Sequence, residues 1–183
     1  MFTLDKEPYS RMKMVDLIDE TDTMKWAILD YHNQKFVLDN IVDSKIFTRE
    51  GHAEFLNKYP TLKRKQYIVY IDNRDLGKIS FLPDKNNVYS GIGYYLFHEN
   101  DMHKHLGLLM VSFAYHFLFD ELNAEKVVYS ALKNNESSIG LSKRLGCRIV
   151  QDDEKIVYLE CTRGDFYKCA SNIDEYLKNV FKE

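Results

Sequence analysis

A short stretch that joins a predicted strand to a predicted helix concentrates groups able to bind an anion. His103, Lys104 and His105 come directly before the expected helix, and Gly107 lies near its start. A helix N-terminus offers unpaired N–H groups and the positive end of the helix dipole, and together these can bind phosphate groups. Glycine would let the backbone approach such a group closely. The spacing predicts a phosphate site, with an ordinary helix start as the alternative.

The elements that must position this junction follow from the spacing of apolar residues. β-branched and aromatic runs predict strands, and apolar residues at helical spacing predict helices. The predicted strands span residues 11–18, 66–71, 76–82, 88–97, 126–131, 148–151 and 155–161. One helix is expected to begin at Asp22 or Thr23 and another at Thr48, and three more to span 105–121, 135–145 and 165–183. This order predicts an α/β fold of the α+β kind around a mixed sheet of about seven strands.

The order of the elements also predicts how the strands connect. Residues 66–97 should form an antiparallel meander, and a strand–helix–strand crossover follows it. Such a crossover is right-handed and joins two parallel strands, so the 88–97 and 126–131 strands should be parallel. Gly91 and Gly93 weaken the first of these as a plain strand. They predict a bulge or a close approach by another backbone or a ligand.

Composition limits the classes of protein to which the chain can belong. It has 183 residues, a net charge of −3 and no Pro-, Gly- or Ser-rich linker, so one domain spanning 1–183 is expected. The sequence has no basic stripe of the kind that binds nucleic acid. It also has no run of about 18 apolar residues, the length that a membrane span requires. The three cysteines form no CxxC pair and indicate reduced thiols, and the scattered histidines predict no metal site. Without an apolar leader segment, the expected location is the cytoplasm.

Two motifs resemble the GNAT (GCN5-related N-acetyltransferase) superfamily. Lys104-His-Leu-Gly107-Leu-Leu109 occupies the place of that family's acyl-CoA loop, Gln/Arg-x-x-Gly-x-Gly/Ala, and matches it fully only at Gly107. The segment from Asn135 to Gly146 is similar to the family's next helix and ends on the same glycine. The resemblance implies that Asn135 contacts the pantetheine arm or orients the helix, while a plain helix cap is the alternative.

The N-terminal part resembles one branch of this superfamily, which contains ribosomal-protein and amino-sugar acetyltransferases. Thr48-Arg-Glu-Gly-His52-Ala-Glu-Phe-Leu56 is similar to that branch's second-helix motif, Thr/Ser-x-Glu-x-His-x-x-Phe/Trp-Leu. His32-Asn33 repeats its Arg/His-Asn pair after the first helix. Within the branch, the chain looks most like the nucleotide-sugar acetyltransferases of the pseudaminic acid pathway. The resemblance therefore implies an amino-sugar nucleotide as the acceptor.

The resemblance covers nearly the whole chain and implies a GNAT fold with helices on both faces of the sheet. It implies acetyl-CoA as the co-substrate and no metal. It also implies a set of cofactor-binding residues: Tyr95, Leu96, Phe97, His103, Lys104, His105, Leu106, Gly107, Leu108, Leu109, Asn135, Ser138 and Lys143.

The resemblance implies direct attack of a neutral amine on the thioester, whose carbonyl is polarised by backbone N–H groups at the end of the 88–97 strand. The family's usual tyrosine acid is replaced here by Ser142, which has no useful acidity, so Tyr94 is a second candidate. His98 and His52 are the candidate bases. The segment expected to wall the acceptor side contains Trp26, Tyr31, His32 and Lys35.

Three classes of function follow from these residues. The first is an N-acetyltransferase that acts on a small amine, with a protein N-terminal acetyltransferase as the variant within that class. The second is an acyl-CoA-binding module without catalysis, which the degenerate loop and Ser142 favour. The third is a structural domain that binds no CoA. A homodimer is compatible with each of them.

Overall fold

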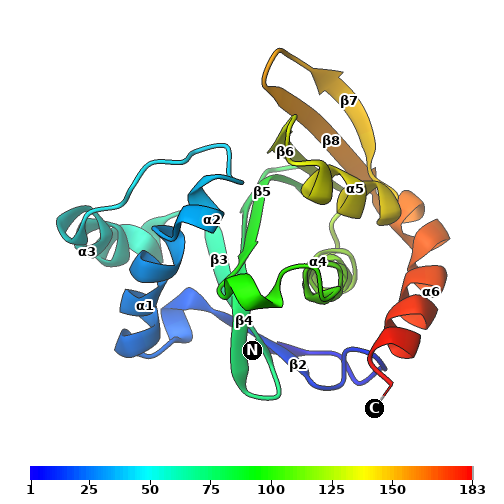
Figure 1. The fold of residues 1–183 in the computed structure, drawn as a ribbon, viewed down its shortest axis with the longest axis horizontal. Helices are drawn as coiled ribbons and strands as arrows, with labels where there is room; N and C mark the ends of the chain where they lie inside the picture. The colour runs from blue at the N-terminus through cyan, green and yellow to red at the C-terminus, as the bar shows by residue number, and fades with distance from the viewer. Residues whose placement is uncertain (183) are drawn as a thin grey trace.

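The computed structural model describes residues 1–182, and an eight-stranded sheet runs through its centre in the order β1-β2-β3-β4-β5-β6-β8-β7 (Figure 1). The strands are β1 (Phe2–Thr3), β2 (Met12–Asp16), β3 (Lys65–Ile71), β4 (Arg74–Pro83), β5 (Val88–Leu96), β6 (Lys126–Leu132), β7 (Arg148–Asp152) and β8 (Ile156–Thr162). The predicted α+β fold with a mixed sheet is confirmed. The additional strand is β1, whose two residues are too few to carry a periodic signal.

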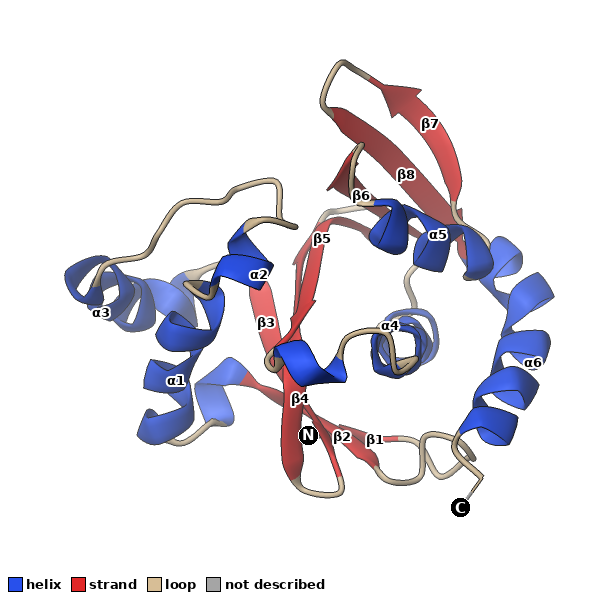
Figure 2. Ribbon diagram, in the orientation of Figure 1, coloured by secondary structure: helices blue, strands red, loops and turns tan. Residues whose placement is uncertain are grey.

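Six α-helices lie on the two faces of the sheet, as expected (Figure 2). They are α1 (Asp22–His32), α2 (Lys35–Leu38), α3 (Arg49–Lys58), α4 (Leu106–His116), α5 (Glu136–Arg144) and α6 (Arg163–Val180). Within residues 1–182, no helix is both long enough and apolar enough to cross a membrane.

Several predicted boundaries shift because a capping side chain ends one element and begins the next. Thr21, rather than Asp22 or Thr23, caps α1 by accepting the Met24 N–H. The strand predicted over 11–18 ends at Asp16, which caps a 3₁₀ turn. Thr162 starts the last helix at Arg163, two residues earlier than predicted. The predicted end of that helix, at position 183, lies outside the described residues.

The predicted helix over 105–121 is divided into two parts. The α-helical part ends at His116, and a π-helical turn continues over Phe117–Glu121. The cap of α3 at Thr48 is confirmed, because its hydroxyl accepts the Gly51 N–H. Gly146 follows α5 with a φ of 89°, the left-handed geometry expected of a residue just past a helix end.

The strand connections agree with the predicted topology. Strands β2 to β5 pair antiparallel in sequence order, and β5 pairs with β6 in parallel. The predicted bulge is also present. The β4–β5 register shifts between Ser80 and Leu82, and Gly91 opposite this shift has a φ of 56°. A left-handed backbone of this kind is tolerated by glycine and strained in other residues.

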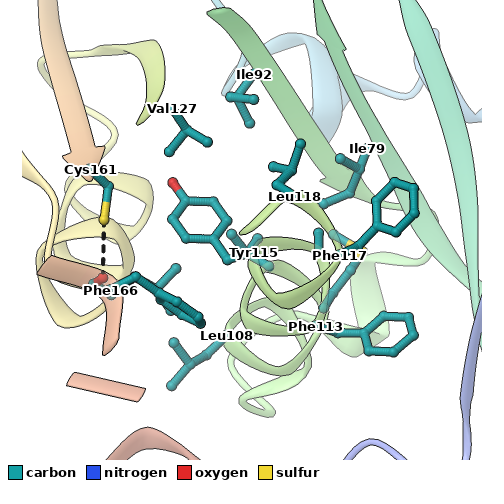
Figure 3. Close-up of a cluster of buried hydrophobic side chains, with 14 of the residues drawn as sticks. Ile79, Ile92, Leu108, Phe113, Tyr115, Phe117, Leu118, Val127, Cys161 and Phe166 are labelled. Carbon is teal, nitrogen blue, oxygen red and sulfur yellow. Dashed lines mark hydrogen bonds between the residues drawn. The ribbon is translucent and has the colours of Figure 1, made fainter. Parts of the chain in front are cut away.

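Helix α4 passes through the middle of the molecule and is buried along its length (Figure 1). Its apolar side chains point in all directions, which is expected of a helix enclosed by protein. Phe113 and Phe117 project on one side, and Tyr115 on the other points toward Val127 and Cys161 (Figure 3). Gly77 of β4 allows this close packing, because a Cβ there would lie 2.7 Å from the Met110 sulfur. The position of α4 relative to β4 and β5 is therefore fixed by packing.

A smaller apolar cluster lies on the opposite face of the sheet, under α1 and α3. Its buried members are Leu17, Ile28, Tyr59, Ile68 and Phe97. Because side chains alternate along a strand, β5 contributes Ile92, Tyr94 and Leu96 to the α4 face and Tyr95 and Phe97 to the α1–α3 face. The strand β5 therefore separates two chemically different environments.

Candidate active site

Strand β5 separates from β6 soon after the two strands begin to pair. Paired residues are limited to Val88 with Lys126 and Tyr89 with Val127. The Phe97 N–H donates to Leu76 O on β4, 3.0 Å away. Because successive N–H groups of a strand point to opposite sides, the Tyr94 and Leu96 N–H groups point toward the diverging β6. The gap thus has backbone donors on one wall.

The start of α4 supplies a second group of backbone donors. His105 has a φ of 61° and precedes the first helical residue, Leu106. Within the helix, the Leu109 N–H is the first to find a carbonyl, that of His105 at 3.0 Å. The N–H groups of Leu106, Gly107 and Leu108 therefore have no acceptor within the helix. A Cβ on Gly107 would lie 3.6 Å from Leu141 of α5, so a small side chain fits there.

The basic residues predicted around this helix start differ in their surroundings. Lys104 and Lys143 are exposed, and His103 is in a left-handed conformation with a φ of 60°. The His105 ring lies 3.0 Å from the Tyr176 hydroxyl of α6. Tyr176 also stacks under the Arg144 guanidinium, 4.5 Å from its ring centre. The exposed lysines keep the site positive, and α6 holds His105 in place.

Tyr176 and Arg144 line a pocket of about 240 Å³ together with Cys169, Asn172 and Ile173. Neither Tyr176 nor Arg144 was among the residues predicted to bind the cofactor. Their sequence spacing marks them only as members of helices. Their proximity to the α4 start depends on how α6 docks, and no local pattern reports that.

A hydroxyl cluster lies between β5 and α5. The Tyr94 hydroxyl is 2.7 Å from Ser138 Oγ, and Ser142 Oγ donates to Ser138 O at 2.8 Å. Asn135 caps α5 by accepting the Ser138 N–H at 3.0 Å, and its amide donates to Asn40 O at 2.9 Å. The predicted residues Tyr94, Asn135, Ser138 and Ser142 are thus brought together, and Asn135 acts as a helix cap.

Burial raises the pKa of Tyr94 above its ordinary value of 10.0, and the hydroxyls of Ser138 and Ser142 act in the opposite direction. The phenol is therefore neutral at physiological pH and can donate a proton. Ser142 is 1% exposed, and its hydroxyl is already engaged with the backbone of its own helix. Of the two candidate acids, Tyr94 has the more suitable chemistry.

His98 lies just past β5 and faces a carboxylate. Its Nε2 is 3.5 Å from Asp75 Oδ2, and the Tyr31 hydroxyl donates to the same oxygen at 2.6 Å. Burial, and then the bond to Asp75, raise the pKa of Tyr31 to about 12. Tyr31 stacks on Phe97 with ring centres 4.1 Å apart. The predicted acceptor-side residue Tyr31 and candidate base His98 therefore share one carboxylate.

Other predicted acceptor-side residues lie apart from this group. His32 is buried, stacks on Phe47 and contacts Lys45 O at 3.0 Å. Lys35 is 87% exposed and pairs with Asp39. Trp26 lines a separate pocket of about 330 Å³ between α1 and α3.

His52 occupies a similarly structural position. It is buried, lies 5.4 Å from the Trp26 ring centre, and contacts Lys25 O at 2.7 Å. These contacts join α3 to α1. No set of three or more histidine, cysteine or acidic residues among 1–182 is arranged to hold a metal ion.

Comparisons with known proteins agree with this architecture. Residues 11–148 match the acetyltransferase (GNAT) domain family, and the chain belongs to that family. The match confirms the prediction of an N-acetyltransferase that uses acetyl-CoA as its co-substrate. No curated protein matches the sequence significantly.

Solved structures with the same fold differ widely in sequence. The N-acetyltransferase PseH of Campylobacter jejuni is 17% identical, with a TM-score of 0.67 over 84% of this chain and 99% of its own. Spermidine N-acetyltransferase from Vibrio cholerae, solved with CoA and spermine, is 9% identical, with a TM-score of 0.72 over 86% and 99%. An aminoglycoside acetyltransferase, AAC(6')-Ib, solved with CoA and kanamycin, is 15% identical, with a TM-score of 0.68 over 86% and 98%.

An acidic side chain at the start of α4 should weaken acetyl-CoA binding without weakening the helix. In Gly107→Asp, the carboxylate favours the helix dipole but repels the cofactor's phosphates. We expect a loss of affinity of about tenfold or more in calorimetry, because one close charge pair contributes on the order of 1–4 kcal/mol.

Gly164→Asp is the matched control, because Gly164 is also the second residue of its helix and a Cβ there would make only an ordinary contact, 4.0 Å from Thr162 Oγ1. Equal affinity losses in the two variants would mean that α4 does not bind the phosphates.

Proposed function

We propose that the chain binds acetyl-CoA in the gap between β5 and β6, with its phosphates at the start of α4. The early separation of β5 from β6 carries this proposal, because it leaves the Tyr94 and Leu96 N–H groups without a strand partner. Bound acetyl-CoA supplies a thioester that an acceptor amine attacks. The Leu96 N–H lies at the end of β5, where it would polarise the thioester carbonyl. Leu106, Gly107 and Leu108 hold the phosphates through their N–H groups.

Tyr94 is the proposed proton donor to the leaving thiolate. Its hydroxyl contacts Ser138 of α5, the helix that also carries Ser142. By the resemblance, the family's usual tyrosine acid would stand at position 142, on α5. In the proposed mechanism, Tyr94 reaches α5 from β5 and takes the role of that tyrosine. Ser138 and Ser142 then orient the Tyr94 hydroxyl. His98, oriented by Asp75, is the proposed acceptor of the amine proton.

Removing the Tyr94 hydroxyl should slow catalysis and leave cofactor binding intact. For Tyr94→Phe we expect kcat to fall at least about a hundredfold, the lower end of the range that a positioned acid contributes, with an unchanged acetyl-CoA Kd. Because the Tyr94 pKa is raised, the neutral donor persists above pH 10. The alkaline limb that belongs to this acid should therefore lie above that pH.

Ser142→Ala is the comparison, since it removes only an orienting hydroxyl and should lower kcat less than about threefold. A larger loss in Ser142→Ala than in Tyr94→Phe would identify the serine as the more important group.

The proposed acceptor is the amine of a small molecule, and an amino-sugar nucleotide is our first choice. The resemblance of the Thr48–Leu56 motif to the amino-sugar branch supports it. The other structures of this fold carry spermine or kanamycin, so the fold alone leaves the acceptor open. A protein N-terminus is the alternative acceptor. An acyl-CoA-binding module is the alternative without catalysis, and Ser142 supports it.

Two measurements test the proposed function. Calorimetry with acetyl-CoA should show binding at one site, and release of free CoA thiol should depend on an amine from a panel of amino-sugar nucleotides, amino sugars, polyamines and peptides. Absence of binding contradicts the whole proposal. Binding without amine-dependent thiol release contradicts catalysis and supports the module.

We also propose that residues 1–183 act as one acetyltransferase domain. The family match and the single sheet support this arrangement. A homodimer is a further proposal, which the exposed Ile149 and Val150 on edge strand β7 support. A cytoplasmic location is proposed because all three cysteines are free.

A further inference from the structure

A buried lysine lies under the α1–α3 face, in the middle of the sheet. Lys78 of β4 is 8% exposed, and its Nζ is 5.1 Å from the centre of the Tyr95 ring. One N–H of the ammonium donates to Gln66 Oε1 at 3.2 Å. Within residues 1–182 the other two N–H groups have no acceptor. Since an ammonium carries three donors, a buried one with a single neutral partner is costly.

The hydroxyl of Tyr95 is a second unsatisfied group at this place. It is buried, and no hydrogen-bond partner is found for it among the described residues. Unpaired buried polar groups are rare in folded proteins and require an explanation, such as a ligand or an ordered water. Tyr95 and Lys78 are opposite each other in the β4–β5 register, so both unsatisfied groups lie on neighbouring strands.

Arg64 adds a second positive charge beside Lys78. Its guanidinium donates to Ser80 Oγ at 3.2 Å and to Gly91 O at 3.0 Å. Arg64 is half-buried and so remains accessible at one edge. Burial, and then the nearby Arg64 charge, lower the pKa of Lys78 to about 8. The two cations lie on one face of the sheet, because Arg64 bonds to Ser80, two residues after Lys78 on β4.

No carboxylate in the described part of the chain forms an ion pair with either cation. The acidic groups on this face have other partners. Asp75 accepts from Tyr31 and faces His98, and Asp16 accepts from the Tyr59 hydroxyl. A buried charge such as Lys78, with a half-buried cation beside it, is destabilising unless an anion compensates it. Lys78 and Arg64 therefore resemble the positive half of an ion-pair network.

The pair lies next to the proposed reaction site. Arg64 contacts Gly91 at the β5 bulge, and Ser80 is opposite Gly93. Gly91 and Gly93 are on β5, the strand whose N–H groups line the cofactor gap, and Arg64 contacts this strand from the α1–α3 face. A group bound here would approach the thioester from the acceptor side, while the phosphates of the cofactor lie at α4.

We propose that Lys78 and Arg64 bind an anionic group, a carboxylate or a phosphate, of the acceptor. This inference rests on the proposed function and names the class of its substrate. The acceptor then carries an amine for acetylation and a negative charge for recognition. Polyamines and aminoglycosides are polycations, so the same two charges repel them. Lys78 and Arg64 thus attract amines that carry an anionic group and repel polycationic amines.

The first test measures binding to the CoA-saturated protein, so that anions cannot enter the cofactor site. Two matched pairs serve as probes in calorimetry. Glucosamine 6-phosphate and glucosamine differ by a phosphate, and serine and ethanolamine differ by a carboxylate. We expect the anionic member of at least one pair to bind at least tenfold more tightly. Preference in the first pair identifies a phosphate, and in the second a carboxylate. No preference in either pair overturns the inference.

The second test replaces the cations. Lys78→Met keeps an unbranched side chain, one atom shorter and without the charge, and Arg64→Gln keeps a donor. Each should reduce the preference for the anionic probe at least fivefold, with the acetyl-CoA Kd unchanged. Lys65→Met is the control, because Lys65 lies on β3 beside Gln66 and its side chain points to the opposite face. A preference that survives in both variants would contradict the inference.

Two further readouts separate this inference from structural effects and from the proposed function. Lys78→Met should raise the melting temperature, because it removes an unpaired buried charge. A lower melting temperature would mean that Lys78 stabilises the fold, and would overturn the inference. Failure of acetyl-CoA to bind would contradict the proposed function alone, since probe pairs titrated without CoA still report on the cation pair through the preference that Lys78→Met and Arg64→Gln remove.

Discussion

The proposed activity depends on one departure from regular sheet pairing. Strands β5 and β6 pair in parallel at their first two registers and then separate. Backbone N–H groups left without a partner are costly when enclosed, so a sheet normally continues its pairing. Here the separation follows the Gly91 bulge, which changes the course of β5. The resulting gap places polar backbone groups beside the apolar core around α4, and an extended cofactor can take the place of a neighbouring strand.

Two packing layers keep this slot in position. Helix α4 is apolar on all sides and is enclosed by the sheet, α5 and α6 (Figure 1). Because it cannot rotate without exposing large side chains, its N-terminus keeps a fixed position beside Leu141 of α5 and Tyr176 of α6. On the other face, α1 and α3 cover a mixed surface in which Phe97 is apolar and Lys78 is charged. In the proposed complex, the cofactor and the acceptor would therefore reach β5 from opposite faces, and the strand itself would carry the reacting centre.

Local signals in the sequence predicted most of the fold. Caps such as Thr48 and Asn135 and the bulge near Gly91 are determined within a few residues, and the structure contains them. Contacts across the sheet were harder to predict. The approach of Tyr94 to Ser138, of Tyr176 to His105 and of Arg64 to Lys78 depends on strand register and helix docking. Lys35 was predicted to line the acceptor side only from its place in the sequence, and its side chain is exposed. On a short helix, the sequence does not indicate which side a charged residue faces.

Amide hydrogen exchange tests the central claim most directly, since it reports on the backbone groups that the account assigns to the cofactor. The Tyr95 and Phe97 N–H groups point toward β4, where Phe97 bonds to Leu76, and should exchange equally slowly with and without acetyl-CoA. The Tyr94 and Leu96 N–H groups face the gap and should become protected when acetyl-CoA is added. Unchanged exchange of Tyr94 and Leu96 in a saturated complex would contradict the account.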